Sequence, residues 1–313
     1  MNFDVLPLPR HLRIKASASG PLEGLRRFQL ACEARKLEHL PALSPTCYKL
    51  MEEDLSQAQL TKLISGDPAL LAWVLRETEE GSLETALSDV PEPELDLALC
   101  TSVAQGLYQD GILRFGGLRK WLWHHQALTG FAAQEIARAL QGSTRLMSRA
   151  RIAGLLHDLG WLVLLTVDEA IARKNLATLY SGDAPLTVIE HETLGTDHGD
   201  LGATLAETWG LPSWLVEVIA DHQVMNKPLP DSLQGTGTQH LCPLVHQAER
   251  LVAEALEYKI PLIGDVSVRA EPAVLPLTQN TRTELITRIR LHAAHLDQLA
   301  TRGYAQMPGL LKL

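Results

Sequence analysis

A histidine and an aspartate stand side by side in the apolar segment RIAGLLHDLGWLVLL, which runs from Arg151 to Leu165. The pair, His157 and Asp158, consists of two strong metal ligands. A charge is costly to bury unless it is paired, so these residues need partners if they lie in the core. Two kinds of partner are open: a bound metal ion, or hydrogen-bonding groups that satisfy the pair without one.

Four more side chains with metal-ligand chemistry stand in or beside predicted helices. They are His125 in WLWHHQALTGFAA, His198 in TDHGDLGA, His222 in IADHQ and Glu249 in PLVHQAERLVAEA. Imidazole and carboxylate are ligands that zinc, iron and manganese share. The alternative for His198 is a helix cap near Asp197, and the alternative for Glu249 is an exposed helical glutamate.

The geometry of a helix limits how the adjacent pair can act. Neighbouring residues of a helix point about 100° apart. His157 and Asp158 can therefore share an ion only if it lies over the groove between them, with other helices supplying the remaining ligands. The other histidines fit no such pattern and are expected at the surface. These are His11, His39, His191, His240, His246, His292 and His295, and His124 is expected to be solvated as well.

The segments that carry these residues are typical of helices. Asp67 precedes PALLAWVL as a predicted N-cap, and Ser44 and Ser56 precede two further helices. Apolar residues recur every three to four positions in GFAAQEIARAL, HGDLGATLAETWG and LPSWLVEVIADH, and Gly210 is a predicted helix stop. The best strand candidate, DVSVRA near Asp265, is short. The sequence therefore predicts an all-α fold.

Three regions are expected along the chain. Residues 1–27 form a Pro- and Arg-containing extension, and residues 28–260 form one helical domain with a loop at about residues 226–240. Residues 261–313 form a C-terminal extension that ends in the predicted helix TRTELITRIRLHAAHLDQLATR.

The composition is that of a globular protein, with 46% hydrophobic and 21% charged residues. The formal net charge of −9 argues against nucleic-acid binding, which depends on Lys and Arg, and leaves protein partners open. The four cysteines form no CxxC unit and are expected to be reduced thiols. No signal peptide and no membrane-spanning run is evident, so a cytoplasmic protein without membrane contact is expected.

Five segments together resemble the HDOD domain, the HD-related output domain of bacterial signalling proteins. In chain order they are LPALSPTCYKLMEE, LISGDPALLAWVL, WHHQ, GLLHDLGWLVLL and DHGDLGATLAETWGLPSWLVEVIADH. The resemblance covers about residues 38–256. It implies an HD-like multi-helix bundle, with the C-terminal helix as an addition, related to metal-dependent phosphohydrolases. The HDOD family itself is mostly described as a non-catalytic signalling module.

The resemblance also implies roles for the six candidate ligands. His125 matches the first ligand of the HD superfamily, and His157 and Asp158 match the HD pair. Glu249 stands where the superfamily has its closing aspartate. Two further positions, His198 and His222, match those that bind a second metal in the HD-GYP branch. The implied cofactor is a divalent iron, manganese or zinc ion.

The chain departs from the catalytic members of the superfamily in four ways. Trp161 stands where HD phosphohydrolases have a lysine after the pair, Gln223 replaces a second histidine after His222, and Glu249 is one methylene longer than aspartate. A Gly-Tyr-Pro signature is absent, which argues against hydrolysis of the HD-GYP kind.

These departures favour a signalling output module that binds a protein partner and retains the HD cleft. One alternative is a metal-dependent phosphohydrolase or phosphodiesterase. Another is a sensor that binds a nucleotide without turning it over. Efficient phosphodiester hydrolysis is not expected.

Overall fold

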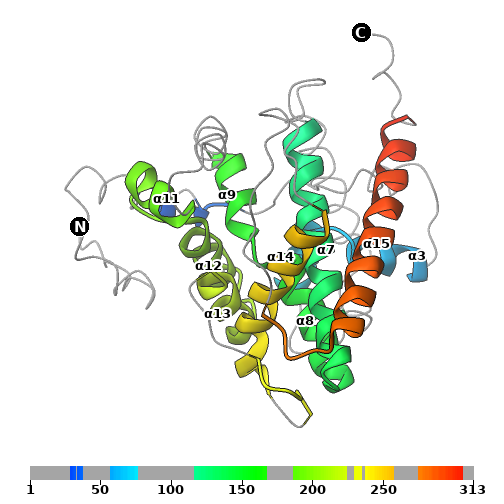
Figure 1. Cartoon of the computed structure of the whole chain (residues 1–313). Helices are drawn as coiled ribbons and strands as arrows, with labels where there is room; N and C mark the ends of the chain where they lie inside the picture. Colours follow the sequence, from blue (N-terminus) through cyan, green and yellow to red (C-terminus); the bar gives the residue numbers. More distant parts are fainter. Residues whose placement is uncertain are drawn as a thin grey trace, which may run out of the picture.

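The computed structural model describes residues 29–32, 34–37, 57–76, 116–167, 186–223, 229–234, 237–256 and 274–305. In these ranges all regular structure is helical, and the protein is an all-α bundle as expected (Figure 1). The helices are α3 (Gln57–Ile64), α4 (Pro68–Arg76), α7 (Gly116–Ala139), α8 (Thr144–Leu156), α9 (Leu159–Val167), α11 (Leu186–Leu194), α12 (His198–Thr208), α13 (Ser213–Asp221), α14 (Leu241–Leu256) and α15 (Gln279–Ala305). A short 3-10 helix spans Thr238–His240.

The helix starts follow the capping chemistry of the sequence. The Asp67 carboxylate accepts hydrogen bonds from the backbone N–H groups of Ala69 and Leu70, at 3.0 and 3.1 Å, so the predicted cap of α4 is confirmed. Asp197 caps α12 by accepting from the Asp200 N–H at 2.8 Å. Gly210 has a φ of 69° and ends the helical run after α12, as predicted.

The predicted C-terminal helix is present as α15. Its apolar face buries Leu285, Ile289 and Leu296 against the bundle. The helix predicted from Ser44, the strand candidate near Asp265 and the extension 1–27 lie outside the described residues. No helix in the described ranges is both long and apolar enough to cross a membrane.

The bundle has two helix pairs that approach closely at glycines, α7 with α8 and α9 with α12. The long helix α7 packs on α8, α14 and α15, and α12 packs on α9 and α13. Gly130 and Gly154 let α7 and α8 approach, since a Cβ on Gly154 would lie 2.8 Å from the Gly130 backbone. Gly160 and Gly202 do the same for α9 and α12, with a Gly202 Cβ 2.7 Å from the Gly160 backbone nitrogen.

The His–Asp pair does not lie within one continuous helix, so that expectation was wrong. His157 is the C-terminal cap of α8, Asp158 follows in the turn, and α9 begins at Leu159. The turn places the Nε2 atom of His157 3.4 Å from Oδ2 of Asp158, so both side chains face one point. Because the last turn of α8 and most of α9 are buried, the turn between them brings the two polar residues into the core.

Candidate metal centre

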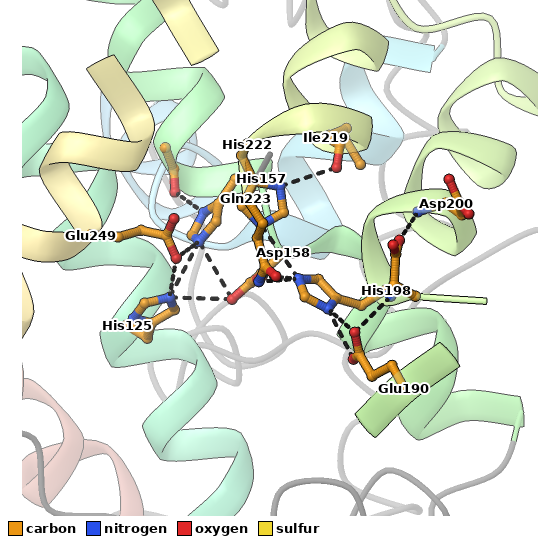
Figure 2. Close-up of polar contacts among 12 residues, drawn as sticks. His125, His157, Asp158, Glu190, His198, Asp200, Ile219, His222, Gln223 and Glu249 are labelled. Atoms are coloured by element: carbon orange, nitrogen blue, oxygen red, sulfur yellow. Dashed lines mark hydrogen bonds and ion pairs between the residues drawn. The ribbon is translucent and has the colours of Figure 1, made fainter. Parts of the chain in front are cut away.

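Five parts of the fold bring the six predicted ligands into one cluster (Figure 2). Their positions are α7 for His125, the α8–α9 turn for His157 and Asp158, the first residue of α12 for His198, the residue after α13 for His222, and α14 for Glu249. All are buried except Glu249, which is half-buried. The structure therefore assembles every candidate ligand, although they span more than a hundred residues of sequence.

Four donor atoms converge on a first position. Nε2 of His125 lies 3.2 Å from Nε2 of His157 and 3.2 Å from Oδ2 of Asp158. Oε1 of Glu249 lies 3.6 Å from Nε2 of His125 and 3.3 Å from Nε2 of His157. Glu249 thus faces the His–Asp pair and is not the exposed helical glutamate of the alternative.

The other oxygen of Asp158 faces a second position. Oδ1 lies 3.2 Å from Nε2 of His198 and 3.6 Å from Nε2 of His222, and these two nitrogens are 3.3 Å apart. Figure 2 shows Asp158 between Glu249 and His125 on one side and His198 on the other. One carboxylate therefore links both groups of donors.

Backbone hydrogen bonds set the tautomers of two histidines. Nδ1 of His157 lies 2.8 Å from the Gly154 carbonyl oxygen, and Nδ1 of His222 lies 3.1 Å from that of Ile219. A carbonyl only accepts, so Nδ1 of each ring carries a proton, and Nε2 is the nitrogen that can present a lone pair to an ion. Those lone pairs face the oxygens of Asp158, which are acceptors too. Acceptors that face one another need a cation between them, either a proton or a metal ion.

A buried carboxylate orients the third histidine. Nδ1 of His198 lies 2.9 and 2.8 Å from the two oxygens of Glu190, a fully buried residue on α11. Metal-binding histidines commonly donate their other ring proton to such a carboxylate, which fixes the ring orientation. His198 is the first residue of α12, but the cap is Asp197, so the helix-cap alternative for His198 is wrong.

The histidines of the cluster lower the pKa of its two carboxyl groups. Burial disfavours ionisation of Asp158, but His157 and hydrogen bonds from His125, His198 and His222 hold its pKa well below the usual range. Burial likewise opposes ionisation of Glu249, and the neighbouring histidines again lower its pKa. Both carboxylates are therefore ionised at neutral pH.

Burial also acts on His198, where it disfavours the charged ring. Glu190 and Asp158 outweigh that effect and raise the pKa of His198 well above its ordinary value. The second position therefore attracts a cation, whether a proton or a metal ion.

The spacing of the first-position donors suits a divalent ion. Two ligands that are each about 2.1 Å from one ion lie about 3.0 Å apart at a right angle and about 3.4 Å apart in a tetrahedron. The measured donor separations of 3.2–3.6 Å fall close to these values. Two imidazoles and two carboxylates form a donor set that iron, manganese and zinc accept.

Trp161 lies against this cluster. Its indole is buried and stacks on the His198 ring, with centroids 5.5 Å apart and planes inclined by 29°. The side chain that replaces the lysine of HD phosphohydrolases is therefore part of the wall that holds His198.

Some supporting groups could not be found from the sequence. Glu190 precedes His198 by eight residues, a spacing that carries no recognised signature. The carbonyls of Gly154 and Ile219 are backbone groups, so no residue type marks them. Gln223 is visible in the sequence as a departure from the family, but its contact with the His198 ring appears only in three dimensions.

The central part of the chain is similar to a known protein family. Residues 95–225 match the model of the HDOD domain. An uncharacterised protein of Treponema pallidum is 25% identical over 199 residues, which are 60% of this chain and 38% of that protein. The match thus spans well under half of the relative's length.

Solved structures share the fold. The MmoQ response regulator of Methylococcus capsulatus aligns with a TM-score of 0.55 and 20% identity, over 80% of this chain and 99% of that one. A virulence factor of Campylobacter jejuni aligns with a TM-score of 0.51 and 15% identity, over 92% and 98% of the two chains. Residues 95–225 are therefore similar to the HDOD domain, and they lie in a helical fold that these solved structures share.

Proposed function

We propose that this protein is a signalling output module whose cleft holds one or more divalent ions and whose surface binds a protein partner. The observation that supports it best is the convergence of His125, His157 and Glu249, whose ligand atoms lie 3.2–3.6 Å from one another, with Oδ2 of Asp158 at 3.2 and 3.4 Å from the two histidines. Histidines and carboxylates that face one another in the core are stabilised by a cation, and a divalent ion bound by the folded domain would supply it. The ion joins α7, the α8–α9 turn and α14.

The proposed ion is tested by elemental analysis of the purified protein, together with thermal unfolding with and without a chelator. The informative variant is His157→Ala/Asp158→Ala, which removes two central donors. His295→Ala is a matched control, because His295 is exposed on α15. We expect iron, manganese or zinc in the wild type and in the control and none in the double variant. Wild-type protein without bound metal after reconstitution would refute the proposed ion.

The signalling role rests on the HDOD match and on the kind of protein that shares the fold. The fold relative from Methylococcus capsulatus is described as a response regulator. The test is direct binding between this protein and purified candidate partners found by affinity capture. Binding that weakens in the double variant would tie the partner surface to the ion-holding cleft, and a folded protein that binds no candidate would count against the role.

A metal-dependent phosphohydrolase is the second candidate, and the placement of Asp158 between two donor groups favours it. When bound, an ion at the first position would polarise a phosphoryl oxygen. The chain's own residues would hold that ion and exclude water, but cation support for a phosphate is weak. Trp161 stands where the superfamily lysine would be, and Arg250, half-buried beside Glu249 on α14, is a candidate replacement.

A nucleotide ligand that is bound without turnover is the remaining proposal for the cleft. A thermal-shift screen with nucleotides and cyclic dinucleotides tests it on the ion-loaded protein. A shift that is absent from the His157→Ala/Asp158→Ala variant would place the ligand at the ion.

A further inference from the structure

Gln223 contacts His198, one of the two histidines that face the second oxygen of Asp158. It follows His222 directly after α13 and is half-buried. Its side-chain amide nitrogen lies 2.8 Å from Nε2 of His198, closer than Asp158 or His222 (Figure 2). The nearest neighbour of this ring nitrogen is therefore an amide group and not another candidate ligand.

The hydrogen bonds of His198 define what this contact does. In the neutral ring, which is the form that binds an ion, Nδ1 holds the proton that faces Glu190. Nε2 then has a single lone pair in the ring plane, and the Gln223 amide N–H donates to it. A lone pair that accepts this proton is not available to an ion.

The central histidine of the first position has different neighbours. Nε2 of His157 is surrounded by His125, Asp158 and Glu249, which are all candidate ligands. Once His198 is engaged, the second position keeps Nε2 of His222 and Oδ1 of Asp158, and His157, a further candidate ligand within 4.8 Å of both, already faces the first position. Two protein donors hold a divalent ion far less well than the four donors of the first position.

We infer that Gln223 limits this protein to one divalent ion by capping the Nε2 atom of His198. The inference rests on the proposed function, because it takes the first position as the one that binds. Gln223 acts here as a residue that sets metal stoichiometry. An ion enters the second position only if the amide withdraws or is replaced.

The test counts ions bound to the full chain. The protein is stripped of metal, reconstituted with Mn²⁺ in excess, freed of unbound ion and analysed for manganese per chain. Gln223→Glu keeps the size of the side chain but replaces the donating amide with a carboxylate that can bind an ion. Gln223→Ala removes the cap alone, and Gln234→Ala, at an exposed position, is the matched control.

We expect one manganese ion per chain in the wild type and in Gln234→Ala, and two in Gln223→Glu. Gln223→Ala should approach two at saturating Mn²⁺. Electron paramagnetic resonance gives an independent readout, because two ions joined by Asp158 are magnetically coupled and a single ion is not. Circular dichroism establishes that each variant is folded.

Several results would overturn the inference while the proposed ion stands. They are two ions in the wild type, one ion in a folded Gln223→Glu protein, or fewer ions in Gln223→Ala than in the wild type. The last result would mean that Gln223 is itself a ligand. No bound ion in the wild type or any variant would overturn the proposed ion and this inference together.

Discussion

Nε2 of His125 lies 3.2 Å from Oδ2 of Asp158, although one residue is in the middle of α7 and the other is in the turn between α8 and α9. This pair joins α7 to the turn between α8 and α9. Its geometry places two donors where one ion can touch both.

Removal of the ion should destabilise the fold. A ligand that binds only the folded state at about 100 times its Kd stabilises it by about 2.7 kcal/mol. A chelator should therefore lower the melting temperature of wild-type protein, and added Mn²⁺ should restore it. The same chelator should leave Asp158→Asn unchanged, and an equal shift in that variant would show that the chelator acts elsewhere.

Glu249→Ala should weaken ion binding without unfolding the domain. Its carboxylate is a half-buried donor to the first position, at 3.3 Å from Nε2 of His157. Loss of groups that merely orient ligands costs about 10- to 100-fold in metal affinity, so loss of a direct donor should cost at least about 10-fold. Competition with a fluorescent chelator measures the change. Glu217→Ala, at an exposed site on α13, should bind as the wild type does; equal affinity in both variants would exclude Glu249 as a ligand.

Gly160→Ala should be strongly destabilising. A Cβ at this position would lie 1.7 Å from the carbonyl oxygen of His198 and 2.9 Å from the Gly202 nitrogen, so α9 and α12 would have to separate. Overpacking of this kind costs about 1–3 kcal/mol, and backbone contacts place this case at the upper end. Gly66→Ala, where the nearest atoms are 3.4 Å away, is the control and should change stability by less than about 1 kcal/mol. Urea unfolding gives both values.

His292 should make the packing of α15 sensitive to acid. The ring is half-buried and stacks on Phe131 of α7, with centroids 4.3 Å apart, so the expectation of a surface residue was wrong. Burial, together with Arg151, His295 and His124, lowers the pKa of His292 to about 4 from an ordinary value of 6.5. The folded state therefore prefers the neutral ring.

The sign of the pH effect follows from that preference. The stability that His292 contributes is fully present above about pH 6.5 and is lost as the pH falls toward about 4. Solvent reaches part of the ring, so we expect about 1 kcal/mol or less at about pH 5. His292→Phe keeps the stacked ring but does not titrate. Its unfolding free energy should fall less than that of the wild type between about pH 7.5 and pH 5, and identical pH profiles would contradict the prediction.

Efficient phosphodiester hydrolysis should be absent. Phosphoryl transfer requires positive charge near the non-bridging oxygens, and the buried Trp161 provides none where the superfamily has a lysine. Turnover of cyclic dinucleotides, nucleoside monophosphates and generic phosphodiesters with Mn²⁺ or Fe²⁺ should equal that of His157→Ala/Asp158→Ala. Turnover that requires the metal and disappears in the double variant would favour the phosphohydrolase.

Much of the fold could be predicted because its signals are local. Asp67 and Gly210 mark helix ends through backbone chemistry within a few residues, and the apolar spacing of α15 gives its buried face. The break at His157 could not be predicted, since the surrounding residues are apolar on both sides and suit one continuous helix. After the break, α9 packs against α12, where Gly160 meets Gly202, and such a contact between distant residues leaves no local signal in the sequence.

The candidate site divides in the same way. Its six candidate ligands could be proposed from residue type and from resemblance to a family. The sequence could not show that both groups of ligands face the same carboxylate, that of Asp158, because this depends on the relative positions of five elements. The same holds for Gln223, whose amide faces His198 only once α13 has packed beside α12.

The position of Glu249 has a consequence for how this domain is divided. The family match ends at residue 225, but α14, with the fourth donor of the first position, begins at Leu241. A fragment cut at the edge of the match would lack this helix and the side of the cleft that it forms. The smallest piece that can be moved intact between proteins is therefore longer than the recognisable motif, and a transplanted copy without α14 would keep the signature and lose a wall of the site.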